Sequence, residues 1–420
     1  MSSQEIRPEA LERNTLAVHA GRQDFAALGV HAPPLDFSTT YPLGDLDADA
    51  ASLGSLAHGE PLRGNPIYAR LHNPTVARFE EALASLEGAD AAVAFGSGMA
   101  ALTACLLAAS RNGRHMVAIR PLYGGSDHLL ASGLLGIDVT WATPETVAEA
   151  IRPDTSLVVV ETPANPTLAL LDVAAIAEQV APVPLLVDST FATPVLQRPL
   201  EHGAALVLHS ATKFLGGHGD VIAGVVACDD AWAAQLRQVR VATGALLHPL
   251  AGYLLHRGLS TLPVRVERAQ EGARELARRL ASDPRVLHVD FPELPGQDPA
   301  GLLGRQMAGP GSLVSFTLAG GQAAARRLLA ALRLITPAVS LGSTDTLIQH
   351  PASLTHQVVG EEGREEGGIG DGLLRLSVGL EAVDDLWRDL DRGLTAATAQ
   401  DETIEWQIAE ESTPLADVVG

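Results

Sequence analysis

The sequence predicts an α/β protein with a mainly parallel sheet in a large domain and a smaller α+β domain after it. Between residues 63 and 262, short apolar runs alternate with segments of helical periodicity, and many of these runs are apolar on both faces. Such runs are typical of parallel strands that are buried between two layers of helices. The predicted strands of this region are 91–95, 116–119, 138–142, 157–161, 185–188, 206–209 and 224–228.

Changes in composition divide the chain into four segments. Residues 1–62 contain scattered turns and predict an extended N-terminal arm with little core of its own. Residues 63–262 form the predicted large domain, and residues 263–400 form the predicted small domain. The acidic tail, residues 401–420, has no clear apolar face, so we expect it to be disordered or to pack on a neighbour.

The small domain has its own signals. A long amphipathic helix is predicted over 264–283, and "SLVSFTL" and "LLRLSVGL" predict two strands. Between them, the Gly/Pro-rich stretch 292–311 is expected to be a connection on the surface.

Charge and composition exclude several classes of function. The 420-residue chain has a net charge of −21, which disfavours nucleic acid and anionic membranes as partners. No apolar run reaches the ~18 residues that a membrane span needs. The N-terminal residues are polar, so we expect no signal peptide. Cys105 and Cys228 stand in apolar surroundings, which is typical of buried free thiols in a reducing compartment. These features predict a cytoplasmic protein.

Lys213 is the sole lysine among the 29 Lys and Arg residues of the chain. It follows an apolar strand in "LVLHSATKFLGGHGD", where Ser210 and Thr212 precede it. An amine can lose its proton and attack a carbonyl group, whereas a guanidinium cannot. The position therefore favours Schiff-base chemistry over a leftover surface charge. A metal-dependent hydrolase using His209, His218 and Asp220 is an alternative, although their spacing fits a compact ligand set poorly.

Other strand ends carry further candidates. Asp188 ends the predicted strand "LLVD", where it could face the same crevice as Lys213 and bind a positively charged group, although a helix cap or a metal ligand is equally common there. "AFGSGMAALTACLLAAS" predicts a strand, a Gly-rich turn and a helix whose N-terminus could bind phosphate. Its spacing fits neither a dinucleotide fingerprint nor a P-loop. Tyr123, in "PLYGGS", could stack on an aromatic cofactor or pack in the core. Arg375, on the strand "LLRLSVGL", suggests a carboxylate clamp or a structural ion pair.

Seven motifs together resemble the Cys/Met-metabolism family of pyridoxal-phosphate enzymes. They are "NPIYARLHNPT", "FGSGMAA", "ETPANPT", "VDSTFATP", "LHSATKFLGGHGDVIAG", "HPASLTH" and "LRLSVGLE". The similarity runs from about residue 14 to 396. The resemblance implies a fold-type-I architecture, pyridoxal 5'-phosphate as cofactor, a small amino-acid substrate, no metal, and a homotetramer built from two catalytic dimers.

The resemblance also implies a role for each matching residue. Lys213 corresponds to the Schiff-base lysine that also shuttles protons, Asp188 to the partner of the pyridine nitrogen, and Tyr123 to the ring-stacking tyrosine that helps as an acid or base. The remaining correspondences are Gly98 and Met99 for the phosphate cradle, Ser210 and Thr212 for its hydroxyls, Tyr68 and Arg70 for phosphate contacts from the adjacent subunit, Arg375 for the substrate α-carboxylate, and Asn165 and Ser340 for the lining of the substrate pocket.

Departures from the family pattern bear on the reaction. Ser189 stands where the family usually has Asn, and Gly125 stands where methionine γ-lyases typically have Cys. Val339 stands where cystathionine-using members usually have Glu, which favours methionine γ-lyase, and "VATGALLHPLAGY" lacks an acidic residue commonly found near there. The leading hypothesis is therefore a γ-eliminating lyase acting on methionine or homocysteine. The alternatives are γ-replacement on an O-acyl-homoserine or cystathionine, and a cofactor-binding protein without turnover.

Overall fold

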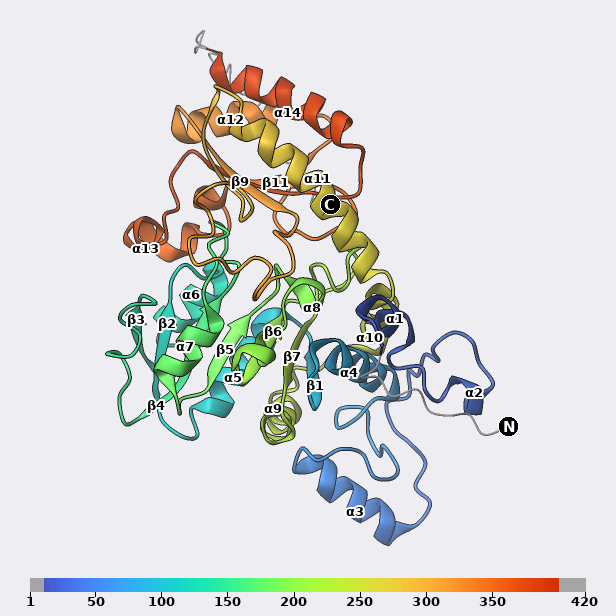
Figure 1. Cartoon of the computed structure of the whole chain (residues 1–420). Coiled ribbons are helices and arrows are strands. Elements are labelled where there is room, and N and C mark those ends of the chain that lie inside the picture. Colours follow the sequence, from blue (N-terminus) through green and yellow to red (C-terminus); the bar gives the residue numbers. More distant parts are fainter. Residues whose placement is uncertain (1–10, 400–420) are drawn as a thin grey trace, which may run out of the picture.

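The computed structural model describes residues 11–399 and contains two sheets, one in each domain (Figure 1). The larger sheet has the strand order β1-β7-β6-β5-β4-β2-β3. Its strands are β1 (Ala91–Phe95), β2 (His115–Ile119), β3 (Asp138–Ala142), β4 (Thr155–Glu161), β5 (Leu185–Asp188), β6 (Leu206–His209) and β7 (Gly224–Cys228). β7 runs antiparallel to β1 and β6, and the other neighbouring pairs are parallel. The predicted strands and the mainly parallel sheet are confirmed, with ends that differ by at most two residues.

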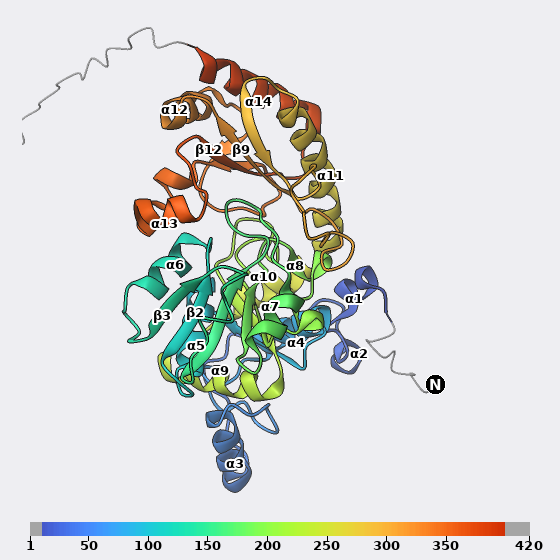
Figure 2. The same cartoon turned by 60° about the vertical axis from the view of Figure 1, so that its left-hand side comes forward.

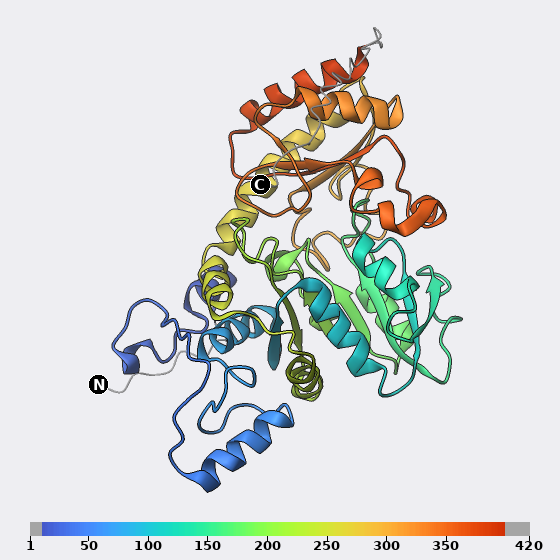
Figure 3. The ribbon, with the colours of Figure 1, turned by 180° about the vertical axis from the view of Figure 1, so that it is seen from behind.

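Helices cover both faces of this sheet, as Figures 1 and 3 show from opposite sides. One face packs on α5 (Gly98–Ala109), α6 (Gly124–Ala131) and α9 (Asp230–Thr243), and the other packs on α4 (Pro74–Glu87), α7 (Val173–Val180) and α10 (Pro249–Leu259). Side chains alternate along each strand. In β1, Val93 and Phe95 join the α5 side, whereas Ala92 and Ala94 join the α4 side. Because both faces are buried, the central strands are apolar along most of their length, and their polar residues stand mainly at strand ends.

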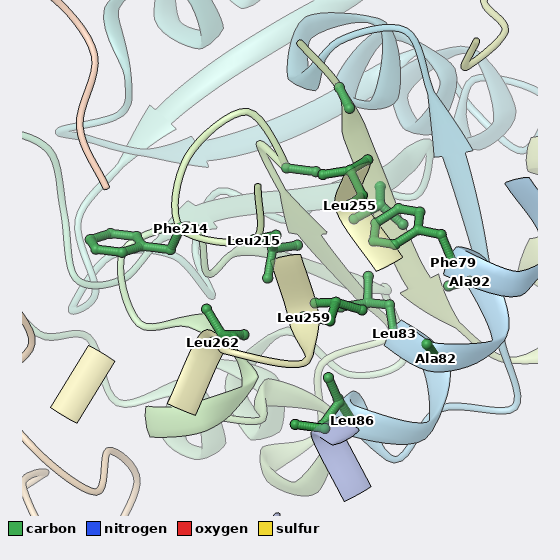
Figure 4. Packing of buried hydrophobic residues seen from close by; sticks show 14 of the residues in the cluster. Phe79, Ala82, Leu83, Leu86, Ala92, Phe214, Leu215, Leu255, Leu259 and Leu262 are labelled. Carbon is green, nitrogen blue, oxygen red and sulfur yellow. The ribbon is translucent and has the colours of Figure 1, made fainter. Parts of the chain in front are cut away.

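The core between α4 and α10 reaches the segment that carries the lysine. Phe79 and Leu83 of α4 pack in one cluster with Leu259 of α10 and with Phe214 and Leu215, which directly follow Lys213 (Figure 4). All of these side chains are buried. The lysine therefore lies on a turn whose next two residues are anchored in the core.

The smaller sheet has the order β10-β11-β12-β9-β8. Its strands are β8 (Val286–Asp290), β9 (Leu313–Leu318), β10 (Thr336–Pro337), β11 (Leu347–Gln349) and β12 (Leu373–Ser377). The helices of this domain are α12 (Gly321–Ala331), α13 (Gly360–Glu366) and α14 (Val383–Thr398), and α11 (Leu262–Ala281) runs along both domains (Figure 2). The predicted helix over 264–283 and the two predicted strands are confirmed. Short elements complete the described chain: α8 (Thr193–Leu196), η2 (Pro199–His202), η3 (Pro351–Ser353) and η4 (Gln357–Val359).

The N-terminal arm differs from the prediction of an extended segment. It contains α1 (Arg13–His19), α2 (Phe25–Leu28) and α3 (Leu46–Ala57). Leu16 and Ala17 of α1 are buried in the core cluster around α4, so part of the arm shares the core of the large domain. α3 lies apart from both sheets (Figure 3).

The stretch 292–311 is also more than a surface connection. Leu302 and Met307 are buried, and the buried Gln306 donates to Gln197 Oε1 at 3.0 Å and accepts from Val173 N at 2.9 Å. These bonds satisfy polar groups that burial removes from water, so the part of the connection around residues 302–307 belongs to the interior, while other parts of it are exposed.

Cys105 and Cys228 are buried free thiols. Within residues 11–399, no helix is long and apolar enough to cross a membrane. The tail at 401–420 lies outside the described residues, and the exact domain boundaries stay predictions.

Candidate active site

A cavity of about 710 Å³ opens at the carboxyl ends of the parallel strands, between the two domains. Ligands of open α/β sheets bind at this edge, because loops from several strands converge there. Eleven of the thirteen residues that the sequence singled out line this cavity. They are Gly98, Met99, Tyr123, Asn165, Asp188, Ser210, Thr212, Lys213, Val339, Ser340 and Arg375.

Lys213 is held in the cavity by the small domain. Its Nζ donates to Ser340 Oγ at 2.7 Å, and its carbonyl oxygen accepts from Gly217 N at 2.8 Å. Burial, followed by the positive charge of Arg375, lowers the pKa of Lys213 to about 8. At pH 7 about a tenth of this amine is therefore unprotonated, against fewer than about one in a thousand for an ordinary lysine. A proton can leave this amine near neutral pH.

Asp188 is the last residue of β5. Its Oδ1 accepts from Thr190 N at 3.0 Å and from Thr190 Oγ1 at 2.5 Å. Thr190 Oγ1 in turn accepts from Ser210 N at 2.8 Å, which ties the carboxylate to the loop after β6. Burial raises the pKa of Asp188, and the Thr190 bonds and the nearby His209 oppose the rise. A bound cation would satisfy this carboxylate.

The contacts of His209 do not suggest a metal ligand. Its Nε2 lies 2.5 Å from Glu87 Oε1, and both side chains are buried. His218 Nδ1 instead lies 2.8 Å from Gly216 O. In the part of the chain that the structure describes, no three His, Cys, Asp or Glu side chains converge as a metal site requires.

The N-terminus of α5 lines the cavity with Ser97, Gly98 and Met99. Ser97 caps it by accepting from Ala100 N at 3.0 Å, and Gly98 and Met99 form its first turn. A Cβ atom on Gly98 would lie 3.1 Å from Ser210 Cβ, so the missing side chain lets the helix start against Ser210. The free N–H groups and the helix dipole make this an anion site. Thr212 contributes less than expected, because its hydroxyl already donates to Ala223 O at 3.1 Å and accepts from Ala223 N at 3.0 Å.

Arg375 lies in the middle of β12 and is 2% exposed. It donates to Asn165 Oδ1 at 2.6 Å and to Ser340 O at 3.0 Å. Burial lowers the pKa of Arg375 to about 10, with the Glu161 carboxyl opposing the shift, so the guanidinium stays charged at neutral pH. Ser340 has φ of 93°, a strained conformation. Its hydroxyl and its carbonyl oxygen are held by Lys213 and Arg375, which fixes this geometry.

Tyr68 and Arg70 do not line this cavity. Arg70 donates to Val241 O at 3.1 Å, and its guanidinium lies 5.5 Å from the centre of the Tyr68 ring. Tyr68 is 44% exposed. Both side chains thus lie on an accessible segment between α3 and α4, where another molecule can reach them.

Two sets of cavity residues were missed from the sequence. Glu161, the last residue of β4, lines the cavity, and Leu354 and Val358 line its mouth beside Val339. The signal for Glu161 was available, because it ends a buried strand as Asp188 does. No periodic signal marked Leu354 and Val358, which lie between β11 and β12 in a stretch of short 3-10 helices and turns.

Comparison with known proteins decides the family. The model of the family described as "Cys/Met metabolism PLP-dependent enzyme" matches residues 14–395. The chain belongs to this family. The predicted family membership is confirmed, and the chain is an enzyme of a PLP-dependent family of Cys/Met metabolism.

Relatives and solved structures of this family match nearly the whole chain. An L-methionine gamma-lyase of Streptomyces avermitilis is 59% identical over 92% of this chain and 90% of its own. An L-methionine gamma-lyase of Brevibacterium sandarakinum is 56% identical over 93% of this chain and 99% of its own. Among solved structures, cystathionine gamma lyase (CalE6) of Micromonospora echinospora has a TM-score of 0.83 at 39% identity, covering 92% of this chain and 100% of that one. The fold-type-I architecture is thereby confirmed.

Proposed function

We propose that this enzyme is a γ-eliminating carbon–sulfur lyase. Its substrate would be methionine or a homocysteine-type amino acid. With one water consumed, its products would be a 2-oxo acid, ammonia and a thiol, or hydrogen sulfide where homocysteine is the substrate. One observation carries the proposal: Lys213, Asp188 and Arg375 share a cavity whose mouth is apolar at Val339. Two relatives named L-methionine gamma-lyase, at 56% and 59% identity, support it.

The cavity fits pyridoxal 5'-phosphate on three sides. The start of α5, with Gly98, Met99 and Ser210, suits the phosphate group. Asp188 would take the protonated ring nitrogen, and Tyr123, 40% exposed beside the cavity, would stack on the ring. Bound there, the cofactor would supply an electron sink that makes the Cα–H and then the Cβ–H of the substrate acidic.

The chain's own side chains would orient the substrate and move its protons. Arg375 would bind the α-carboxylate by a charge-assisted pair, while Asn165 and Ser340 hold the guanidinium in place. Lys213, with a pKa of about 8, can take a proton from one carbon and return it to the next. Tyr123 would assist as an acid or base.

Val339 sets which leaving group the cavity accepts. It is 54% exposed at the mouth, where Leu354 and Val358 are also exposed. The carboxyl groups that line the described cavity are Glu161 and Asp188, and both lie at strand ends. A distal ammonium group, as in cystathionine, would lose its hydration here without a partner, at a cost of about 1–3 kcal/mol. A thioether is not charged, so it would not pay this cost of lost hydration.

Val339→Glu should move the preference from methionine toward cystathionine. The introduced carboxylate can pair with the distal ammonium, so we expect the ratio of the two kcat/KM values to shift by about 10-fold or more. Val339→Gln is the matched control, because it adds similar bulk without charge and should shift the ratio far less. An equal shift in both variants would mean that size, and not charge, sets the preference.

A direct assay tests the proposed reaction. The purified enzyme with methionine should release 2-oxobutyrate, ammonia and methanethiol in equal amounts. Release that depends on added cysteine, with cystathionine as product, would point to γ-replacement instead.

The site is proposed to be shared between two subunits of a tetramer. Tyr68 and Arg70 lie outside their own chain's cavity, on the segment between α3 and α4, and would reach the phosphate of a neighbour. The proposed compartment is the cytoplasm, which suits two buried free thiols.

Mixing two inactive variants tests the shared site. Lys213→Ala and Arg70→Ala subunits should regain up to about a quarter of wild-type activity, since half of randomly mixed dimers hold one complete site. Lys213→Ala mixed with Arg375→Ala is the control and should stay inactive, because both residues come from one chain. If hybrid dimers form without regaining activity, Arg70 does not serve the neighbouring site.

A further inference from the structure

Glu161 is a buried carboxyl group that the proposed chemistry does not use. It ends β4 and pairs in register with Asp188 at the end of β5. It is 4% exposed and lines the cavity. Two carboxyl groups side by side in the interior are unfavourable unless other groups compensate them, so the contacts of Glu161 indicate what it does.

Both oxygens of Glu161 hold backbone of the cavity. Oε2 accepts from Tyr123 N at 2.8 Å, and Oε1 accepts from Asn165 N at 2.9 Å. Asn165 Oδ1 in turn accepts from Arg375 at 2.6 Å. One carboxyl group thus fixes the loop of the ring-stacking tyrosine and, through Asn165, the guanidinium that would bind the substrate.

The Tyr123 loop is also held from the opposite domain. A Cβ atom on Gly124 would lie 2.0 Å from Thr355 O, so the backbone at the start of α6 packs directly on the small domain. The loop is therefore clamped between Glu161 on the sheet side and residue 355 on the other side. Without Glu161, the clamp loses one of its two sides.

The position is electrostatically costly. Burial, followed by the Asp188 carboxyl, raises the pKa of Glu161 well above its usual range, while the two backbone N–H groups and Arg375 oppose the rise. A neutral or apolar side chain would avoid this cost. It would leave at least one buried N–H group without an acceptor.

We propose that Glu161 is a positioning residue that sets Tyr123 and Asn165 relative to Asp188 from a single carboxyl group. The inference rests on the proposed function, because it assigns Tyr123 and Arg375 to cofactor and substrate. Beyond the proposed function, Glu161 would support both the tyrosine that stacks on the ring and, through Asn165, the arginine that binds the substrate carboxylate.

Glu161→Gln tests the proposal. Glutamine has the same shape but one acceptor oxygen, so one of the two loops loses its bond. We expect kcat/KM for methionine to fall on the order of 100-fold, with KM rising and kcat falling together. The apparent Kd for norleucine, which has an α-carboxylate but no leaving group, should rise, and the absorption band of the bound cofactor should shift. Glu161→Asp keeps both oxygens and should lose less on each measure.

Asp389→Asn is the matched control. Asp389 is a buried carboxylate of α14 that accepts from Arg333 N, Leu334 N and Ile335 N at 2.9–3.2 Å, away from the cavity. This variant should lower the melting temperature and leave KM, norleucine binding and the absorption band unchanged.

Two results would overturn the inference. One is a Glu161→Gln enzyme with wild-type norleucine affinity and absorption. The other is the same set of changes in Asp389→Asn as in Glu161→Gln. A wild-type protein that shows no cofactor band at all would instead overturn the proposed function, and this inference with it.

Discussion

Lys213→Arg should lower kcat by at least about a thousandfold. A guanidinium keeps the positive charge near Ser340, but it cannot lose a proton at working pH and so can neither attack a carbonyl nor carry protons. No second side-chain amine exists in the sequence to replace Lys213. The purified variant should also lose the yellow absorption of covalently attached cofactor, as absorbance and stopped-flow measurements would show.

Covalent labelling checks the same residue independently. Borohydride reduction of the wild-type holoenzyme should fix the cofactor to one peptide, the one that contains Lys213. Because the pKa of this amine is about 8, attachment of added cofactor should quicken as the pH rises from 7 to 9, as more of the amine loses its proton. A label found only on the N-terminal amine would contradict the assignment of Lys213.

Arg375→Leu should raise KM for methionine about 100-fold or more. The guanidinium is charged and fixed by Asn165 and Ser340, and its removal leaves the substrate carboxylate buried without a partner. Arg375→Lys keeps the charge but not the planar fork, so its KM should lie between those of wild type and Arg375→Leu. A variant with lower melting temperature but unchanged KM would show that Arg375 is structural, which is the alternative that the sequence left open.

The sheet was predictable because its strands are buried on both faces. Short apolar runs such as 157–161 are typical of strands buried in a parallel sheet. Ligands of such sheets bind at the carboxyl ends of the strands, so the residues at those ends are candidates for the site. That logic brought Asp188 and Lys213 to one crevice before any resemblance was used. The same reasoning places Glu161 at this edge, because it ends β4 as Asp188 ends β5.

Other features lay beyond the sequence for physical reasons. The arm looked extended because its turns are scattered and its sequence indicates little core of its own, yet α1 forms where Leu16 and Ala17 can pack on α4. The burial of Leu302 and Met307 depends on contacts between segments far apart in the chain, which local composition does not encode. Leu354 and Val358 resemble core residues by type, and only the folded chain shows them at the mouth of the cavity.

The central claim is elimination from a thioether rather than replacement, and one comparison tests it. A single wild-type preparation should be assayed for 2-oxobutyrate released from methionine and for cystathionine made from an O-acyl-homoserine and cysteine. The apolar mouth at Val339 predicts a higher kcat/KM for release from methionine, with little cystathionine formed. Faster synthesis of cystathionine than release of 2-oxobutyrate would contradict the lyase assignment.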